Sequence, residues 1–270
     1  MKKQKSTLKI FLYLSFFIIL LLGFDKRLKV THYSYTNAKI PLSFDNYNIL
    51  QISDFHCASF GQNEKLLINR IKELSPDLIV FTGDMIDKKH TTISNISILL
   101  NEISTIAPIY AVNGNHEKDN SVLYKQLQSL YQKYNVTELN DRTISLSQNN
   151  ETIYLHGLNW YSSSYFFNLP KLNNNHLNIL LSHGSNYFDV LSSYNYDLIL
   201  SGHVHGGIIR LPFLGGLIAN DNTLFPKYDK GLFYENSTTM ISSSGLGNAA
   251  IPRFFNRPEL VLITLHTTSG

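Results

Sequence analysis

The sequence predicts an α/β fold built around a largely parallel, buried sheet. Short apolar runs bounded by turn residues alternate with stretches in which apolar residues recur at helical spacing. Such an alternation implies parallel strands joined by crossover helices. With 270 residues, 43% of them hydrophobic, the chain is long enough to bury the core of one such domain.

Five apolar runs are the expected strands, at residues 47–53, 78–82, 109–112, 177–182 and 198–201. The helices between them are expected at residues 63–74, 93–106 and 119–132. Before these elements, residues 28–36 are expected to form a first strand or hairpin. Residues 136–160 and the chain from 206 onward show short strand patterns without long helices, which favours a more antiparallel second half.

The N-terminal segment has the pattern of a membrane anchor. Residues 10–24 are uncharged and strongly apolar, four lysines precede them, and no small-residue cleavage site follows. A retained signal anchor is therefore favoured over a cleaved leader or a buried helix. The predicted organisation is a transmembrane anchor at residues 1–27, a connector with the first strand at 28–46, and one folded domain at 47–268. The lysine bias predicts a single-pass protein of the cell membrane whose folded domain is extracytoplasmic.

The charge is distributed unevenly along the chain. Residues 1–30 contain seven Lys or Arg and one acid, a net charge of +6, and the other 240 residues contain 16 bases and 19 acids, a net charge of −3. A slightly acidic body argues against a nucleic-acid partner, and no feature of the sequence indicates a protein partner. The single cysteine, Cys57, excludes an intrachain disulfide framework and a Cys-rich zinc module.

Five polar motifs stand where predicted strands end: SDFH at 53–56, GDMID at 83–87, GNHE at 114–117, SHG at 182–184 and GHVHGG at 202–207. In open α/β sheets, ligands bind beyond the carboxyl ends of the strands. We therefore expect the five motifs to converge on a single site at one edge of one sheet.

Carboxylate, amide and imidazole groups dominate these motifs, and this mixed oxygen and nitrogen set suits Mn²⁺, Fe or Zn²⁺. Asp-x-His and His-x-His each place two of these groups on one side of an extended backbone. Seven such ligands are too many for one catalytic ion but fit two ions that share a carboxylate. Two ions about 3.5–4 Å apart are an arrangement that cleaves phosphoesters.

The motifs D-x-H, G-D, G-N-H-[D/E], H and G-H-x-H, in this order, resemble the calcineurin-like metallophosphoesterase superfamily, and the resemblance covers residues 47 to 266. The C-terminal part is similar to the membrane-anchored bacterial branch of YkuE/YaeI type. The resemblance implies a four-layer α/β/β/α sandwich for residues 47–268 and a metallophosphoesterase, a hydrolase of ester bonds. It also implies two divalent metal ions, with Mn²⁺ favoured over Fe or Zn²⁺.

The resemblance further implies a role for each motif residue. The expected ligands are Asp54, His56 and His205 for one ion, Asn115, His183 and His203 for the other, and Asp84 as the bridge between them. A hydroxide that bridges the ions is the expected nucleophile. His116 is the expected acid for the leaving group, and Asp87 matches the carboxylate that orients this histidine.

Several residues near the motifs have a second interpretation. Glu117 is interpreted as a helix cap, and Asp87 could cap a helix as well. Arg210 and Arg253 could bind substrate phosphate, but each could equally form a surface salt bridge. Cys57 is expected to be a small packing residue.

The expected reaction is hydrolysis of a phosphodiester or pyrophosphate in a membrane lipid or envelope molecule, because an anchor concentrates an enzyme at that surface. A UDP-diacylglucosamine-type substrate is one candidate, and the lipid bilayer and a phosphorylated small molecule or lipid are the expected partners. The alternatives are a phosphatase of soluble nucleotides or phosphoproteins, and an inactive metal-binding scaffold. The scaffold is disfavoured because no expected ligand is missing.

Overall fold

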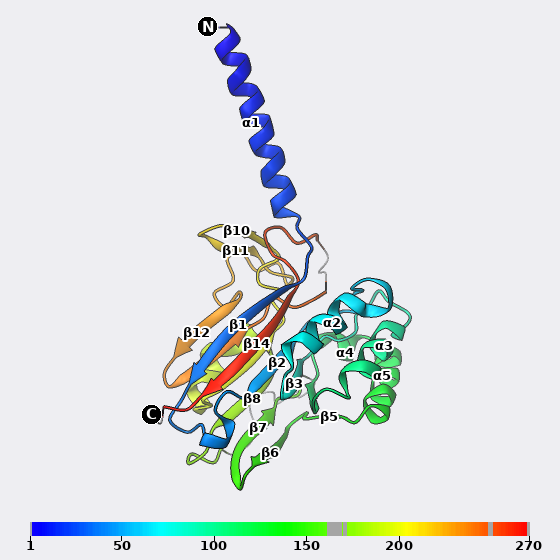
Figure 1. Ribbon diagram of the computed structural model, residues 1–270, viewed down its shortest axis with the longest axis vertical. Helices are drawn as coiled ribbons and strands as arrows, with labels where there is room; N and C mark the ends of the chain where they lie inside the picture. Colours follow the sequence, from blue (N-terminus) through cyan, green and yellow to red (C-terminus); the bar gives the residue numbers. More distant parts are fainter. Residues whose placement is uncertain (1, 161–168, 170–171, 248–250, 269–270) are drawn as a thin grey trace.

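Two six-stranded sheets stack face to face, and helices cover the outer face of one of them (Figure 1). This arrangement is seen in a computed structural model that describes residues 2–160, 169, 172–247 and 251–268. The architecture is the mixed α/β fold that the sequence predicts. The two stacked sheets agree with the sandwich that the resemblance implies and with a separate sheet in the second half of the chain.

The first sheet carries the strands from the N-terminal half together with the last strand. In spatial order its strands are β1 (Lys29–Thr36), β14 (Glu259–His266), β2 (Asn48–Ile52), β3 (Leu78–Thr82), β4 (Ile109–Val112) and β5 (Val136–Glu138). Strands β2 to β5 are parallel, whereas β14 is antiparallel to β2 and parallel to β1. β1 is therefore one edge of this sheet and pairs along its whole length with β14.

The second sheet is mixed. In spatial order its strands are β12 (Gly231–Glu235), β13 (Thr238–Ser242), β9 (Leu198–Gly202), β8 (Asn178–Gly184), β7 (Glu151–Gly157) and β6 (Arg142–Gln148). Only the two outer pairs, β6 with β7 and β12 with β13, are antiparallel. Strands β10 (Ile209–Leu211) and β11 (Gly215–Ile218) form a separate two-stranded ribbon. The second half is thus less antiparallel than expected.

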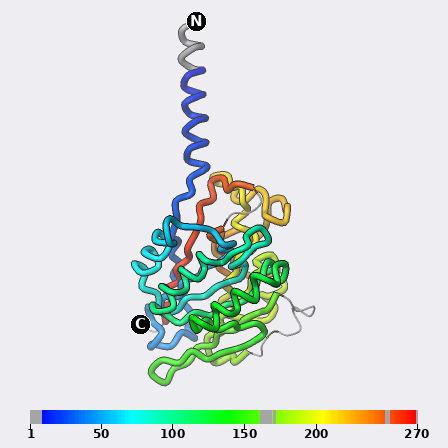
Figure 2. Tube along the Cα trace, turned by 90° about the vertical axis from the view of Figure 1, so that its right-hand side faces the viewer, coloured from blue at the N-terminus to red at the C-terminus, as the bar shows by residue number. Residues whose placement is uncertain are grey.

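Helices cover the first sheet much more fully than the second. Figure 2 shows the covering helices, which are α2 (Lys65–Leu74), α3 (Ser94–Ile103), the short α4 (Asn115–Asp119) and α5 (Ser121–Lys133). Asn120 separates α4 from α5, and its side chain accepts a hydrogen bond from the Leu123 amide at 3.1 Å, which caps α5. Against the second sheet, the described residues place only α6 (Phe188–Leu191) and two flanking turns of 3₁₀-helix. Within the described residues, the fourth layer is therefore short.

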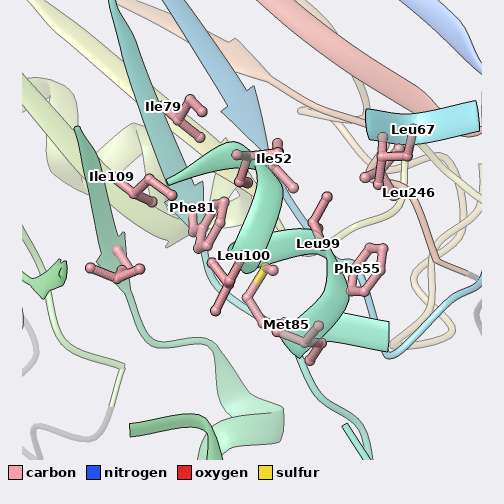
Figure 3. Close-up of a cluster of buried hydrophobic side chains, with 14 of the residues drawn as sticks. Ile52, Phe55, Leu67, Ile79, Phe81, Met85, Leu99, Leu100, Ile109 and Leu246 are labelled. Carbon is pink, nitrogen blue, oxygen red and sulfur yellow. The ribbon is translucent and has the colours of Figure 1, made fainter. Parts of the chain in front are cut away.

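Alternating side chains of the buried strands supply separate cores. From β3, Ile79 and Phe81 point to the helices and Leu78 and Val80 point between the sheets, and all four are fully buried. This follows from the period-two geometry of a strand that is covered on both faces. Figure 3 shows the helix-side cluster, where Phe81 lies among side chains of β2, β4 and α3.

Helix α1 (Lys2–Gly23) extends away from the sheets (Figures 1 and 2). Within the part of the chain that the structure describes, no helix is both long enough and apolar enough to span a membrane. This finding contradicts the predicted transmembrane anchor and, with it, the predicted localisation as a single-pass protein of the cell membrane.

Truncating Phe81 to alanine should lower the free energy of unfolding by about 3–5 kcal/mol, because it leaves a cavity between the first sheet and its helices. Urea denaturation followed by circular dichroism measures this change. The matched control is Phe213→Ala, at a fully exposed position, where a change within about 0.5 kcal/mol is expected. Equal effects of the two substitutions would contradict the assignment of Phe81 to the core.

Candidate metal centre

The five polar motifs meet where the two sheets lie together. Three of them follow β2, β3 and β4 of the first sheet, and two end or follow β8 and β9 of the second. The His203 amide donates to the Asp54 carboxylate at 3.2 Å, and His183 Nδ1 lies 2.8 Å from the Thr82 carbonyl oxygen. The site therefore lies between the carboxyl ends of two sheets rather than at one edge of a single sheet.

Asp54, His56 and His205 form the first group of potential ligands, and all three are buried. His56 Nε2 and His205 Nε2 lie 3.1 Å apart, and Asp54 Oδ1 lies 4.0 Å and 3.6 Å from them. Two nitrogens and one oxygen thus face a common centre, a donor set that suits a borderline divalent cation.

The second group consists of Asp84, His183 and His203, with Asn115 beside them. His183 Nε2 lies 3.2 Å from Asp84 Oδ2, 3.2 Å from His203 Nδ1 and 3.3 Å from Asn115 Oδ1. His183 Nδ1 faces the Thr82 carbonyl and carries a proton, which leaves Nε2 as the nitrogen that a cation would bind. Burial lowers the pKa of His183, but the Asp84 carboxylate outweighs it and raises this pKa to about 9, so a cation would displace a proton from Nε2.

Asp84 lies between the two groups. Its Oδ1 accepts a hydrogen bond from the His116 amide at 2.8 Å, which leaves Oδ2 as the second oxygen. Oδ2 is buried and has no hydrogen-bond partner among the described residues, and it lies 3.2 Å from His183 Nε2 and 3.7 Å from His56 Nε2. A buried carboxylate oxygen without a donor is costly unless a cation neutralises it. The residues present therefore fit two metal ions that share Asp84.

Charge and burial set the protonation of these groups. Burial lowers the pKa of His203 to about 4, with the neighbouring His183 as the next cause, and burial also lowers the pKa values of His56 and His205. These three imidazoles are neutral at pH 7, the form that binds metals. Burial alone would raise the pKa of Asp84, but His183 and the other nearby imidazoles hold it well below its usual range.

The backbone at the site is strained. Five of the seven expected ligands have positive φ angles: Asp54 (49°), His56 (48°), Asp84 (54°), His203 (76°) and His205 (50°). Non-glycine residues rarely occupy this region, and the cost is sustained where the surrounding structure fixes the backbone. A Cβ atom at Gly202 would collide with Ser53 and with the Asp54 carboxylate, so this position next to His203 requires glycine.

His116 borders the centre and is less buried than the expected ligands. Its ring packs edge-on against His56 at 4.8 Å, and its Nε2 lies 3.9 Å from Asp84 Oδ2. Its side chain is 23% exposed, so a substrate could reach it. His116 Nδ1 is buried and has no hydrogen-bond partner within the described part of the chain.

Asp87 does not orient His116. Its Oδ1 instead accepts hydrogen bonds from the amides of Lys89 and His90, at 2.9 and 2.8 Å, and contacts His90 Nδ1 at 2.9 Å. The reason is local, because an aspartate readily bonds the amides two and three residues onward in a turn. The carboxylate is therefore paired with a different histidine from the one predicted.

The two arginines have different surroundings. Arg210 forms a salt bridge of 2.6 Å with Asp229, which corresponds to the simpler of its two interpretations. Arg253 is 5% exposed, lies 3.3 Å from His205 Nδ1 and donates to the carbonyls of Gly245 and Gly247. Its Nη1 is buried without a hydrogen-bond partner among the described residues. Burial lowers the pKa of Arg253 to about 10, so the group remains cationic at neutral pH.

Glu117 has a wider role than the helix cap that we predicted. It accepts from the Gly114 amide at 2.7 Å, which caps α4, and also from the amides of Asp84 (3.0 Å) and Met85 (2.8 Å). Burial, with the nearby Asp84 charge as the next cause, raises the pKa of Glu117 to about 7. Glu117 therefore connects the loop after β3 to the loop after β4. Its spacing from Gly114 is that of a capping box. That spacing does not predict the bonds from Glu117 to the amides of the loop after β3.

Two further residues at the site, Ser53 and Trp160, are not predicted by the motifs to have a role. The Ser53 hydroxyl donates to Asp54 Oδ2 at 2.6 Å. The Trp160 ring lies against His183 and His203, with ring centroids 5.3 and 5.0 Å apart. Trp160 is the only tryptophan of the chain and follows the end of β7, which is the one sequence signal that pointed to it.

Comparison with known proteins gives the same site a family context. The sequence model of the family described as Calcineurin-like phosphoesterase matches residues 47–207. The chain is 32% identical over 255 residues to "Uncharacterized metallophosphoesterase YkuE" of Bacillus subtilis, which covers 90% of this chain and 87% of the relative. It is 26% identical to "UDP-2,3-diacylglucosamine pyrophosphatase LpxG" of Chlamydia muridarum (87% and 88% covered) and 25% identical to "Phosphodiesterase YaeI" of Escherichia coli (81% and 82% covered).

Replacing Asp84 by asparagine should lower the metal content more than any other single ligand substitution, because both groups lose the same carboxylate charge. We expect about two ions per wild-type chain and a clear loss in the variant, measured by mass spectrometry of the protein after loading with Mn²⁺ and gel filtration. Asp77→Asn, at the opposite end of β3, is the matched control and should retain the wild-type content. Wild-type metal content in Asp84→Asn would exclude Asp84 as the bridge.

Replacing Glu117 by glutamine should lower the free energy of unfolding by about 1–3 kcal/mol, because the amide group turns a donor toward backbone N–H groups that need an acceptor. Urea denaturation of the metal-free protein measures this change without a contribution from bound ions. Glu73→Gln, an exposed control on α2, should change stability by less than about 0.5 kcal/mol. Equal stability of both variants would contradict the connecting role of Glu117.

Proposed function

Because the chain belongs to the calcineurin-like phosphoesterase family and is a metallophosphoesterase, we propose that it hydrolyses a phosphodiester or pyrophosphate bond with two divalent metal ions. The observation that carries this proposal is the position of Asp84 Oδ2, which is buried without a donor between two groups of imidazole nitrogens. The proposed ligands are the seven residues that the motifs predict: Asp54, His56, Asp84, Asn115, His183, His203 and His205.

Two divalent ions held there supply positive charge that acidifies water and stabilises negative charge on the phosphoryl oxygens. We propose Mn²⁺ for both positions, since mixed carboxylate, amide and imidazole ligands suit this ion, with Fe and Zn²⁺ as the alternatives. The chain's own part is to fix these ligands. The Ser53 hydroxyl and the His203 amide orient Asp54, and the His116 amide orients Asp84.

His116 is the proposed acid for the leaving group. It borders the centre, its Nε2 lies 3.9 Å from Asp84 Oδ2, and its side chain is partly exposed. Its amide donates to Asp84, so the backbone holds the residue in place whatever the side chain does. Because Asp87 bonds His90 and Lys89, the proposal does not include Asp87 as the group that orients His116.

The names of two relatives, a diacylglucosamine pyrophosphatase and a phosphodiesterase, support a diester or diphosphate substrate. A UDP-diacylglucosamine-type molecule is one candidate. Arg253 is the proposed substrate-binding cation, because its Nη1 is buried without a partner beside His205. Arg210 is not proposed for this role, since Asp229 already neutralises it.

Soluble nucleotides or phosphoproteins are the alternative substrates, and an inactive metal-binding scaffold is the alternative function. The scaffold is disfavoured because the site retains all seven expected ligands and His116. Both alternatives are separated from the proposal by assaying phosphomonoesters, phosphodiesters and diphosphates with Mn²⁺ added.

The wild-type protein should hydrolyse bis(p-nitrophenyl) phosphate when Mn²⁺ is present, and His116→Ala should lower kcat about 10²–10⁴-fold, the usual contribution of a positioned acid. The metal content of the variant should stay near that of the wild type, because the backbone N–H of residue 116 still donates its hydrogen bond to Asp84. His32→Ala, at an exposed position on β1, is the control and should keep full activity. Loss of metal in His116→Ala would show that His116 is a ligand instead.

A further inference from the structure

A groove of about 470 Å³ leads from the metal centre to the base of α1. His56 and Arg253 line it at the end next to the ligands, and residues 25–28 line it at the other end. Asp87, Lys89 and His90 form part of its side. Its volume is within the range of about 300–1,000 Å³ that accommodates small-molecule ligands, so it has room for more than the phosphate at the centre.

The far wall of the groove is fixed in place. Arg257 donates to the carbonyls of Arg27 and Leu28, at 2.8 and 3.1 Å, and its Nε lies 3.4 Å from the Asp25 carboxylate. The Phe24 ring packs edge-on against Phe254, with ring centroids 5.0 Å apart. The segment between α1 and β1 is thus bound to the loop before β14.

Positive charge dominates this groove. Two acids line it, and each has partners of its own. Asp25 is paired with Arg27 at 2.9 Å, and Asp87 accepts hydrogen bonds from the backbone amides of Lys89 and His90. The ammonium groups of Lys26 and Lys89 have no ion pair with any of the described residues. Arg253, 95% buried, adds its unpartnered Nη1 at the end beside the metal centre.

We propose that this groove binds the departing half of the substrate and that Lys89 and Lys26 recognise a second phosphate there, beyond the one at the metal centre. The inference rests on the proposed function and narrows it to diesters of diphosphate. In hydrolysis, the oxygen of water joins the phosphorus at the metal centre, and the bond from that phosphorus to the bridging oxygen breaks. The electron pair of the bond goes to the departing phosphate, and the two protons of the water go to the products or the solvent.

Asp87 is a positioning residue in this proposal. Its bonds to the Lys89 amide, the His90 amide and the His90 ring close the turn after β3. The turn places the exposed side chains of Lys89 and His90 along the side of the groove. The carboxylate therefore acts on the departing group through the shape of its loop and not through His116.

Two substrates that share the thymidine phosphate half test the proposal. In thymidine 5′-(p-nitrophenyl phosphate) the departing group carries no phosphate, and in thymidine 5′-diphosphoglucose it is a sugar phosphate. The double variant Lys26→Ala/Lys89→Ala should lower kcat/KM for the diphosphate about tenfold more than for the p-nitrophenyl ester, the size of one lost charge-assisted hydrogen bond. Lys125→Ala, on the exposed side of α5, should leave the ratio of the two values unchanged.

Binding of a non-hydrolysable probe separates this inference from the proposed function. Calorimetry with the Mn²⁺-loaded protein should show that thymidine 5′-(α,β-methylene)diphosphate binds more tightly than thymidine 5′-monophosphate, and that the double variant loses this preference. The same binding result without hydrolysis of either substrate would support recognition of a second phosphate in the groove and reject the phosphoesterase proposal. Hydrolysis of the p-nitrophenyl ester together with an unchanged diphosphate preference in the double variant would show that Lys26 and Lys89 do not recognise a second phosphate.

Discussion

The buried carboxylate of Asp84 is the constraint around which the rest of the site is organised. A negative charge so far from water persists only where positive charge or donors compensate it. On one side the His116 amide binds Oδ1, and on the other the imidazoles of His183 and His56 surround Oδ2. The Asp84 amide is itself fixed by Glu117. The loops after β3 and β4 and the imidazoles of both sheets therefore all depend on this single position.

Much of the fold follows from the sequence because its strands are short apolar runs with clear ends. The runs at 78–82 and 109–112 coincide with β3 and β4. The division into two sheets was not predictable from the same runs. A strand covered on both faces is apolar at every position, so its sequence does not say which other strands lie beside it.

The candidate site shows the same division between local and non-local information. The motif order indicates which residues come together, because each motif follows a strand. The motif order does not indicate which side chain a given residue bonds, since Asp87 contacts His90, three residues onward, and not His116. Arg210 and Arg253 have the same side chain, but the first is paired by Asp229 and the second is buried beside His205. Only tertiary structure distinguishes them. The apolar run at residues 10–24 led to a wrong prediction, since no described helix is both long and apolar enough to span a membrane.

The place of β14 in the first sheet has a consequence for the order of synthesis. This strand is the last of the chain, yet it lies between β1 and β2, which are among the first. While the ribosome is still translating the C-terminal third, β1 has no neighbour and β2 presents an open edge on that side, a surface to which foreign strands readily add. The nascent chain cannot complete its first sheet until β14 has left the exit tunnel. The first sheet is therefore completed late in synthesis, after the strands and helices that precede β14 have all been made.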